Sequence, residues 1–258
     1  GNVIGVDRPG ASKLPNEIGI EVRSPENTIG GADEKAGNVI SGNKVAGITF
    51  QDETFGNIMQ KNLVQGNFIG TDERGAQNLG NDGHGIHIKH SDGNIIGAVH
   101  ASDPNKRVGE KNTIAHNGGA GIFVEIGSGN RISRNVILNN GDKGIRHLRG
   151  EKEGSQRPIL TSINSNRSQG IQIKGKFDQP PLINPSETVM VEFFSSEQCN
   201  PAKAGGARFI GTVEVPERRY SNFSFEALLP VQKGHFITAT ATAPRSNTSE
   251  FSNCIEVK

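Results

Sequence analysis

One short hydrophobic pattern recurs along the first two thirds of the chain. A glycine is followed by an isoleucine, a variable residue and, in most copies, a second apolar residue, as in Gly85-Ile86-His87-Ile88. Because side chains alternate between the two faces of a strand, Ile86 and Ile88 share one face and His87 lies on the other. Each copy is therefore predicted to be a short strand with one buried face. The copies begin at Gly19, Gly47, Gly85, Gly121, Gly144 and Gly170.

The similarity extends beyond these strands. Residues 1–22 and 66–88 both contain Gly-Asn-x-Ile-Gly-x-Asp, followed by a glycine and a leucine at matching offsets and then by Gly-Ile. The intervals between the six glycines are 28, 38, 36, 23 and 26 residues. The short intervals fit one solenoid coil of roughly 20 to 29 residues, and the long ones imply inserted loops. The pattern predicts stacked coils in which isoleucine lies over isoleucine and the asparagines between strands bond one another.

Two other repeat architectures fit the sequence less well. A leucine-rich repeat needs a dense leucine pattern, and leucine is scarce here. A β-propeller needs blades of about 40 residues built from hairpins, and no such hairpin pattern is present. A stack of short parallel strands is the favoured architecture.

The Gly-Asn-x-Ile-Gly-x-Asp and Asn-x-Ile-x-x-Asn…Gly-Ile rungs resemble the right-handed parallel β-helix repeats of secreted and surface bacterial proteins, the pectate-lyase-like superfamily. That superfamily includes pectate lyases, polygalacturonases, mannuronan epimerases and many large surface proteins. The resemblance covers about residues 1–176 and implies an all-β, right-handed parallel β-helix in an extracellular or cell-surface protein. It implies the fold and no single activity.

The repeats stop after residue 176. Residues 177–187 are predicted to form a linker, and residues 188–258 a small β-sandwich-like domain, because longer strand patterns and most phenylalanines lie there. The chain also opens inside a repeat, which leads us to expect a fragment of a larger protein. The predicted C-terminal strands are Thr188–Ser195, Arg208–Pro216, Ser221–Leu228, Phe236–Ala243 and Ser252–Val257.

Both cysteines, Cys199 and Cys254, lie in this C-terminal part. One pair in one domain predicts a disulfide that closes a loop of about 55 residues and contributes roughly 4 kcal/mol to stability. Two free thiols are the alternative. A disulfide would indicate an oxidising compartment.

Charge and hydropathy exclude some partners. The chain has 28 Lys and Arg against 27 Asp and Glu, and no basic stripe predicts nucleic-acid binding. No apolar run approaches the roughly 18 residues of a membrane span. His84, His87 and His90 are spaced so that their rings point to different faces of a strand, and no metal or other cofactor is predicted.

The variable positions of the repeat predict what the outward face of the coils carries. One outward column is expected to hold Glu21, Thr49, His87, Phe123, Arg146 and Gln172. A second is expected to hold Arg23, Gln51, Lys89, Glu125 and Lys174, with His147 nearby. Candidate catalytic residues are therefore His87, Lys89, Glu125, Arg146 and His147, which combine acid, base and anion-binding groups. The alternative is an ordinary solvated face of a solenoid.

The signatures of the superfamily's enzymes are missing from the sequence. The paired Asp motifs and Arg-x-Lys signature of polygalacturonases are absent, and so is the Tyr-Gly-x-Asp-Pro-His signature of mannuronan epimerases. No calcium-binding Asp cluster of the pectate lyase kind can be assembled. With no Trp and one Tyr, the chain is also poorly equipped to stack on sugar rings.

The sequence therefore favours a non-catalytic extracellular protein that serves as a stalk, an adhesin or a self-assembling structural subunit. In the last case the open N-terminal rung would pair head to tail with another chain. The alternative is a lyase or hydrolase of an acidic polysaccharide that uses the five candidate residues in a groove along the coils. A carbohydrate-binding module without turnover is a further alternative.

Overall fold

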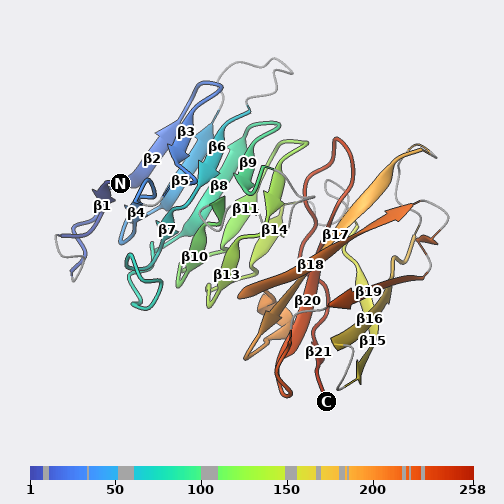
Figure 1. Cartoon of the computed structure of the whole chain (residues 1–258). Helices are drawn as coiled ribbons and strands as arrows, with labels where there is room; N and C mark the ends of the chain where they lie inside the picture. The colour runs from blue at the N-terminus through green and yellow to red at the C-terminus, as the bar shows by residue number, and fades with distance from the viewer. Residues whose placement is uncertain are drawn as a thin grey trace.

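The computed structural model describes residues 1–7, 12–33, 35–51, 61–99, 110–148, 156–166, 170–179, 184, 186–216, 219–220, 222–227 and 230–258. Within these ranges the protein is built mainly of β-strands, and a 3-10 turn, η3, spans Pro201–Lys203. Among the described segments, none forms a helix long and apolar enough to cross a membrane. Parallel strands fill the N-terminal part and antiparallel strands the C-terminal part (Figure 1).

The parallel strands form three stacked sheets. Sheet A contains β1 (Val3–Ile4), β4 (Val39–Ile40), β7 (Phe68–Ile69), β10 (Thr113–Ala115) and β13 (Val136–Leu138). Sheet B contains β2 (Ile18–Val22), β5 (Ala46–Gln51), β8 (His84–His90), β11 (Ile122–Val124) and β14 (Ile145–His147). Sheet C contains β3 (Thr28–Gly30), β6 (Leu63–Gln65), β9 (Ile95–Gly97) and β12 (Arg131–Ser133). The chain visits the sheets in the constant order A, B, C, which is consistent with a parallel β-helix.

Columns of isoleucine fill the coil interior. In sheet B, Ile86 pairs with Ile48 of the preceding coil and Ile122 of the following coil. All three side chains are fully buried and belong to one continuous apolar core. The predicted stacking of isoleucine on isoleucine is confirmed. At about 25 cal/mol per Å² of buried apolar surface, burial of these columns stabilises the stacked coils.

The repeated glycine before each sheet B isoleucine is required by close packing. A Cβ atom on Gly85 would lie 2.6 Å from the carbonyl oxygen of Gly121 and 2.7 Å from Ile114 Cγ2. Such contacts are too short for any side chain, so only glycine lets successive coils approach at this corner.

Asparagine ladders run along the coils, as the sequence predicts. In most steps the backbone N–H and the Nδ2 group of one asparagine both donate to Oδ1 of the next, as between Asn38 and Asn67, at 3.0 and 2.9 Å. Buried polar groups need such partners, and the ladders satisfy them coil by coil. The three ladders consist of Asn2, Asn38, Asn67, Asn112 and Asn135; of Asn16, Asn43, Asn81, Asn117 and Asn140; and of Asn27, Asn62, Asn94, Asn130 and Asn247.

The third ladder ends on a residue from the C-terminal part of the chain. Asn247 Oδ1 accepts from the backbone N and the Nδ2 of Asn130, at 2.9 and 3.0 Å. Thr248 N donates to Asn130 O, and Thr248 Oγ1 accepts from Ile132 N. Residues 247–248 therefore take the place of a further strand beside β12.

A second segment covers the last strands of sheets A and B. Ile137 and Gly206 exchange two backbone hydrogen bonds of 2.8 Å, and Gly144 N donates to Ala204 O at 3.0 Å. Ala204 and Phe251 also join the apolar core of the coils. We call residues 204–206 and 247–251 the cap segments, because together they supply hydrogen-bond partners and apolar contacts to the C-terminal end of the coil stack.

The antiparallel strands form two sheets that share a second apolar core. Sheet D contains β15 (Ile159–Asn166), β16 (Gly170–Lys176) and β19 (Phe223–Ala227). Sheet E contains β17 (Thr188–Ser196), β18 (Arg208–Pro216), β20 (Phe236–Thr242) and β21 (Ile255–Glu256). Sheet E lies between the coils and sheet D (Figure 1): Phe193 packs in the second core, whereas Phe194 packs in the core of the coils.

The coil rung expected at Gly170–Lys174 is wrong. This segment lies in β16, which pairs antiparallel with β15 and β19; in the described residues, the last strand with parallel pairing is β14. Ile171 and Ile173 are buried as a rung requires, but they face the second core. Alternation of apolar residues identifies a strand and does not distinguish parallel from antiparallel partners.

The C-terminal strands otherwise follow the sequence pattern closely. β17, β18 and β20 match the predicted strands within one residue at either end. β19 lies inside the range predicted from residue 221 to 228, whose ends are outside the described residues. β21 is shorter than predicted, and β15 has no counterpart among the predicted strands.

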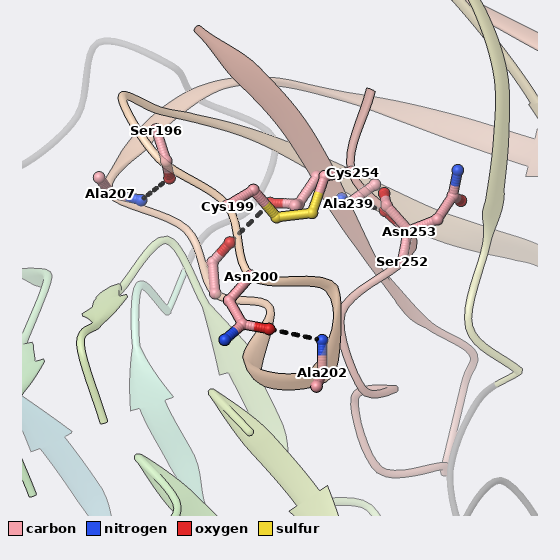
Figure 2. The surroundings of a disulfide bond; sticks show 11 residues. Ser196, Cys199, Asn200, Ala202, Ala207, Ala239, Ser252, Asn253 and Cys254 are labelled. Atoms are coloured by element: carbon pink, nitrogen blue, oxygen red, sulfur yellow. Dashed lines mark hydrogen bonds between the residues drawn. A yellow bond between two sulfur atoms is a disulfide. The ribbon is translucent and has the colours of Figure 1, made fainter. Parts of the chain in front are cut away.

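A disulfide links the two chain segments that carry the caps of the coil stack. Cys199, in the β17–β18 connection, is bonded to Cys254, just before β21 (Figure 2). The connection that carries Cys199 also carries cap residues 204–206, and Cys254 follows cap residue Phe251 closely. The bond therefore ties together the two chain segments that close the coil stack.

A buried carboxylate also links sheet E to the last coil. Glu192 Oε1 accepts from Ser133 Oγ at 2.7 Å, and Oε2 accepts from Arg134 N at 3.2 Å. Burial raises the pKa of Glu192 above its ordinary value, and these hydrogen bonds oppose the shift. The contact orients sheet E on the coil end, although burial of the charge weakens it.

Removal of one ladder asparagine should destabilise the protein strongly. Asn67→Ala leaves the donors of Asn38 without their buried acceptor and should lower the free energy of unfolding by about 2–4 kcal/mol. Urea unfolding followed by circular dichroism measures the change. Asn164→Ala, at an exposed site in β15, is the control and should change stability by less than about 0.5 kcal/mol. Equal effects of the two substitutions would contradict a structural role of the ladder.

Glu192 should make the stability of the protein depend on pH. Because its pKa is raised in the folded state, the folded protein binds this proton more tightly than the unfolded chain does. The resulting stability is present below the ordinary value of 4.5 and is lost as the pH rises through the raised pKa. As the pH rises from 4.5 through the raised pKa, the unfolding free energy of the wild type should therefore fall relative to that of Glu192→Gln.

Urea unfolding at a series of pH values measures this difference. Glu226→Gln, on the solvent side of sheet D, controls for the exchange of glutamate for glutamine. A difference for Glu192→Gln that does not vary with pH would contradict the prediction.

Candidate functional site

The outward column of sheet B has the register that the repeat predicts. Glu21 pairs with Thr49, Thr49 with His87, and His87 with Phe123. Phe123 in turn pairs with Arg146, which ends the column at β14. Gln172, expected as the next member, lies in β16 of sheet D and does not join it. The candidate site is therefore the outward surface of sheet B over its last three coils.

Aromatic rings cover one another at the centre of this surface. The Phe123 ring centroid lies 5.1 Å from that of His87 and 4.7 Å from that of His84. The Arg146 guanidinium lies over the Phe123 ring, 5.3 Å from its centroid. Phe123 is only 9% exposed as a result. Its ring is used in packing and cation–π contact and offers no open face to a sugar.

His87 and Glu125 form the closest pair among the candidate residues. His87 Nε2 lies 2.7 Å from Glu125 Oε2. Burial lowers the pKa of His87 below its ordinary value, and the hydrogen bond and charge of Glu125 oppose that shift. The imidazole is therefore neutral at neutral pH, and because a carboxylate only accepts, the ring proton lies on Nε2. Chemically, the pair is a histidine whose tautomer is fixed by a carboxylate.

The other two outward candidates are paired elsewhere. Arg146 Nη1 donates to Asp142 Oδ2 at 2.7 Å, and Lys89 Nζ donates to Gln51 Oε1 at 3.2 Å. The two side chains thus extend to different neighbours on either side of the His87–Glu125 pair. Asp142 was not among the candidates, because it precedes its strand and the strand pattern gives no signal for it.

His147 lies on the opposite face of sheet B. It pairs in register with Val124, two residues after the inward-facing Ile145, and only 4% of it is exposed. Its Nε2 lies 2.8 Å from the carbonyl oxygen of Thr248, a cap residue. The five candidates therefore do not converge. His147 belongs to the coil end, where the alternation of the strand places it.

His84 also has a structural partner. Its Nδ1 accepts from Ala120 N at 3.0 Å. Burial, then repulsion by His87 and Arg146, lowers its pKa to about 4, so the ring is neutral. In the part of the chain that the structure describes, no group of three or more His, Cys, Asp or Glu side chains is placed to hold a metal ion.

Comparison with known proteins adds no family to this description. No protein-family model matches the chain, and no curated protein shows significant sequence similarity to it. The assignment of a function depends on the geometry alone.

Glu125 should control the protonation of His87. Glu125→Gln keeps a hydrogen-bond acceptor but removes the charge that raises the pKa of His87, so that pKa should fall further below its ordinary value. An NMR titration of the histidine ring signals measures it. His116, whose pKa is lowered by burial alone, is the internal control and should not change. A pKa of His87 that stays constant or rises would show that the pair does not form in solution.

Proposed function

We propose that this protein is a non-catalytic extracellular or cell-surface protein in which a right-handed parallel β-helix serves as a rigid stalk for a C-terminal β-sandwich. The observation that carries the proposal is that the five candidate residues have partners within the protein. His87 pairs with Glu125, Arg146 with Asp142, Lys89 with Gln51, and His147 with the cap. These groups bond to the protein itself and are not directed at one shared reaction centre.

The stalk role is supported by how stiffly the coils are connected. Three asparagine ladders and a continuous apolar core run along the stack, and the core continues into the cap segments. A disulfide between Cys199 and Cys254 supports an oxidising compartment, and hence an extracellular location. The predicted division into residues 1–176, 177–187 and 188–258 stays a prediction; the antiparallel pairing of β15 and β16 favours a boundary soon after β14.

Among the structural roles, a stalk or adhesin is favoured over a subunit that assembles head to tail. In a head-to-tail filament the C-terminal coil of one chain must offer its strand edges to the first coil of the next. Here residues 204–206 and 247–248 already bond to β12, β13 and the start of β14. Assembly through this end would require the cap segments to leave.

An enzyme acting on an acidic polysaccharide is the second candidate, favoured by the His87–Glu125 pair. A neutral histidine with its proton fixed on Nε2 presents Nδ1 as a base, and Lys89 and Arg146 on neighbouring coils could attract a uronate carboxylate. The pair itself supplies one carboxylate, already bonded to the histidine, and not the two that most glycosidases use.

Incubation with polygalacturonate, alginate and hyaluronate tests the proposal. We expect neither the ultraviolet absorbance of unsaturated uronate ends nor new reducing ends. Cleavage that disappears in Glu125→Gln and in Arg146→Ala, with the fold intact by circular dichroism, would overturn the proposal in favour of the enzyme. Lys44→Ala, at an exposed corner outside the column, is the control for loss of a surface cation.

A further inference from the structure

A cleft of about 550 Å³ lies where the coils meet the β17–β18 connection. One wall is formed by Ile137–Asn140, at the end of sheet A, and the other by residues of the connection between Ser196 and Ala207. The cleft is separate from the outward surface of sheet B, and none of the candidate residues lines it. Its volume is within the range of small-molecule binding sites, which occur preferentially where two parts of a protein meet.

The charges around the cleft balance. Its lining contains one carboxylate, that of Glu197, and one ammonium group, that of Lys203. A site for a phosphate or a polyanion carries an excess of cations. This lining has no excess of cations over anions. It therefore suits a ligand without net charge.

The rest of the lining combines neutral polar groups with apolar surface. Asn139, Gln198 and Asn200 are exposed and contribute side-chain amides, and Leu138 and Ala207 contribute apolar surface. A side-chain amide both donates and accepts through one planar group, which matches neighbouring hydroxyls that also do both. Sugar rings present such hydroxyls at their edges and C–H groups on their faces.

We propose that this cleft binds a neutral oligosaccharide of two or three sugar units. The amides of Asn139, Gln198 and Asn200 bond its hydroxyls, and the C–H faces of the rings lie on Leu138 and Ala207. The proposal goes beyond the stalk function and does not depend on it, since the cleft lies away from sheet B.

Two polar groups of the lining are already held in place. Asn200 Oδ1 accepts from Ala202 N at 3.0 Å and so begins the η3 turn, which directs Nδ2 away from that turn (Figure 2). Ser196 Oγ accepts from Ala207 N at 3.1 Å, so its hydroxyl hydrogen is available to a ligand. The neighbouring disulfide fixes the connection that carries both residues. Such preorganisation lowers the cost of ordering the site on binding.

Both walls contribute to the proposed contacts, and this has an energetic consequence. The coils supply Leu138 and Asn139, whereas the connection supplies Gln198, Asn200 and Ala207. A ligand that touches both walls binds only when the connection is docked on the coils. Bound saccharide should therefore raise the melting temperature of the protein.

Calorimetric titration of the whole chain with maltotriose, cellotriose and tri-N-acetylchitotriose tests the proposal. At least one trisaccharide should bind and raise the melting temperature. Asn200→Asp keeps the acceptor for Ala202 N but removes the amide donor, and should weaken binding about tenfold without unfolding the protein. Asn222→Asp, an exposed asparagine in the antiparallel part, is the matched control and should bind like the wild type.

A second variant keeps the test decisive if Asn200→Asp disturbs the turn. Ala207→Phe fills the cleft, leaves the backbone bond to Ser196 in place and should abolish binding. Three outcomes would overturn the proposal. They are no binding of any trisaccharide at millimolar concentration, binding that both variants leave unchanged, and binding that only Arg146→Ala removes. The last outcome would place the saccharide on sheet B and would also count against the stalk proposal, whereas the first two would leave that proposal standing.

Discussion

The whole coil stack depends on one interaction, the hydrogen bonds, two in most steps, that a buried asparagine oxygen accepts from the asparagine of the preceding coil. Strands of two or three residues form few backbone hydrogen bonds with their neighbours. At the corners between them, asparagine amides are buried and need partners. The ladders at these corners satisfy those amides and fix the axial register of the coils. The isoleucine columns then supply the apolar burial that this register allows.

A ladder of this kind must end on an acceptor. Along each step the donors belong to the earlier coil and the oxygen to the later one. The last coil therefore needs an acceptor that no further coil provides. The third ladder solves this with Asn247, and the exposed strand edges are covered by residues 204–206. Sheet E thus acts as the covering layer that any sheet edge requires, and the same docking creates the cleft between the coils and the β17–β18 connection.

Much of this architecture could be predicted from the sequence, because its causes are local. The isoleucine columns, the asparagine corners and the outward order from Glu21 to Arg146 all follow from a repeat that each coil carries in full. The Asn130–Asn247 bond could not be predicted, since its partners are 117 residues apart and Asn247 lies in no repeat. Strand alternation places His147 on the inward face, two residues after Ile145, but its hydrogen bond to Thr248 could not be predicted for the same reason. For β16, the local pattern predicts a strand, but the partners of that strand are set by the second core.

The origin of Asn247 also constrains the order in which the molecule can form. Neighbouring coils are joined by ladder bonds that span 23 to 45 residues along the first ladder, so coils can add one after another as the chain is synthesised. The edge of sheet C at the end of the stack, however, stays open until Asn247 has been made, 117 residues after its partner Asn130. During that interval a nascent chain presents unpaired strand edges and the apolar interior of the last coil. We therefore expect the period between completion of the coils and arrival of the cap to be the stage at which the nascent protein is most prone to pair with a second copy of itself.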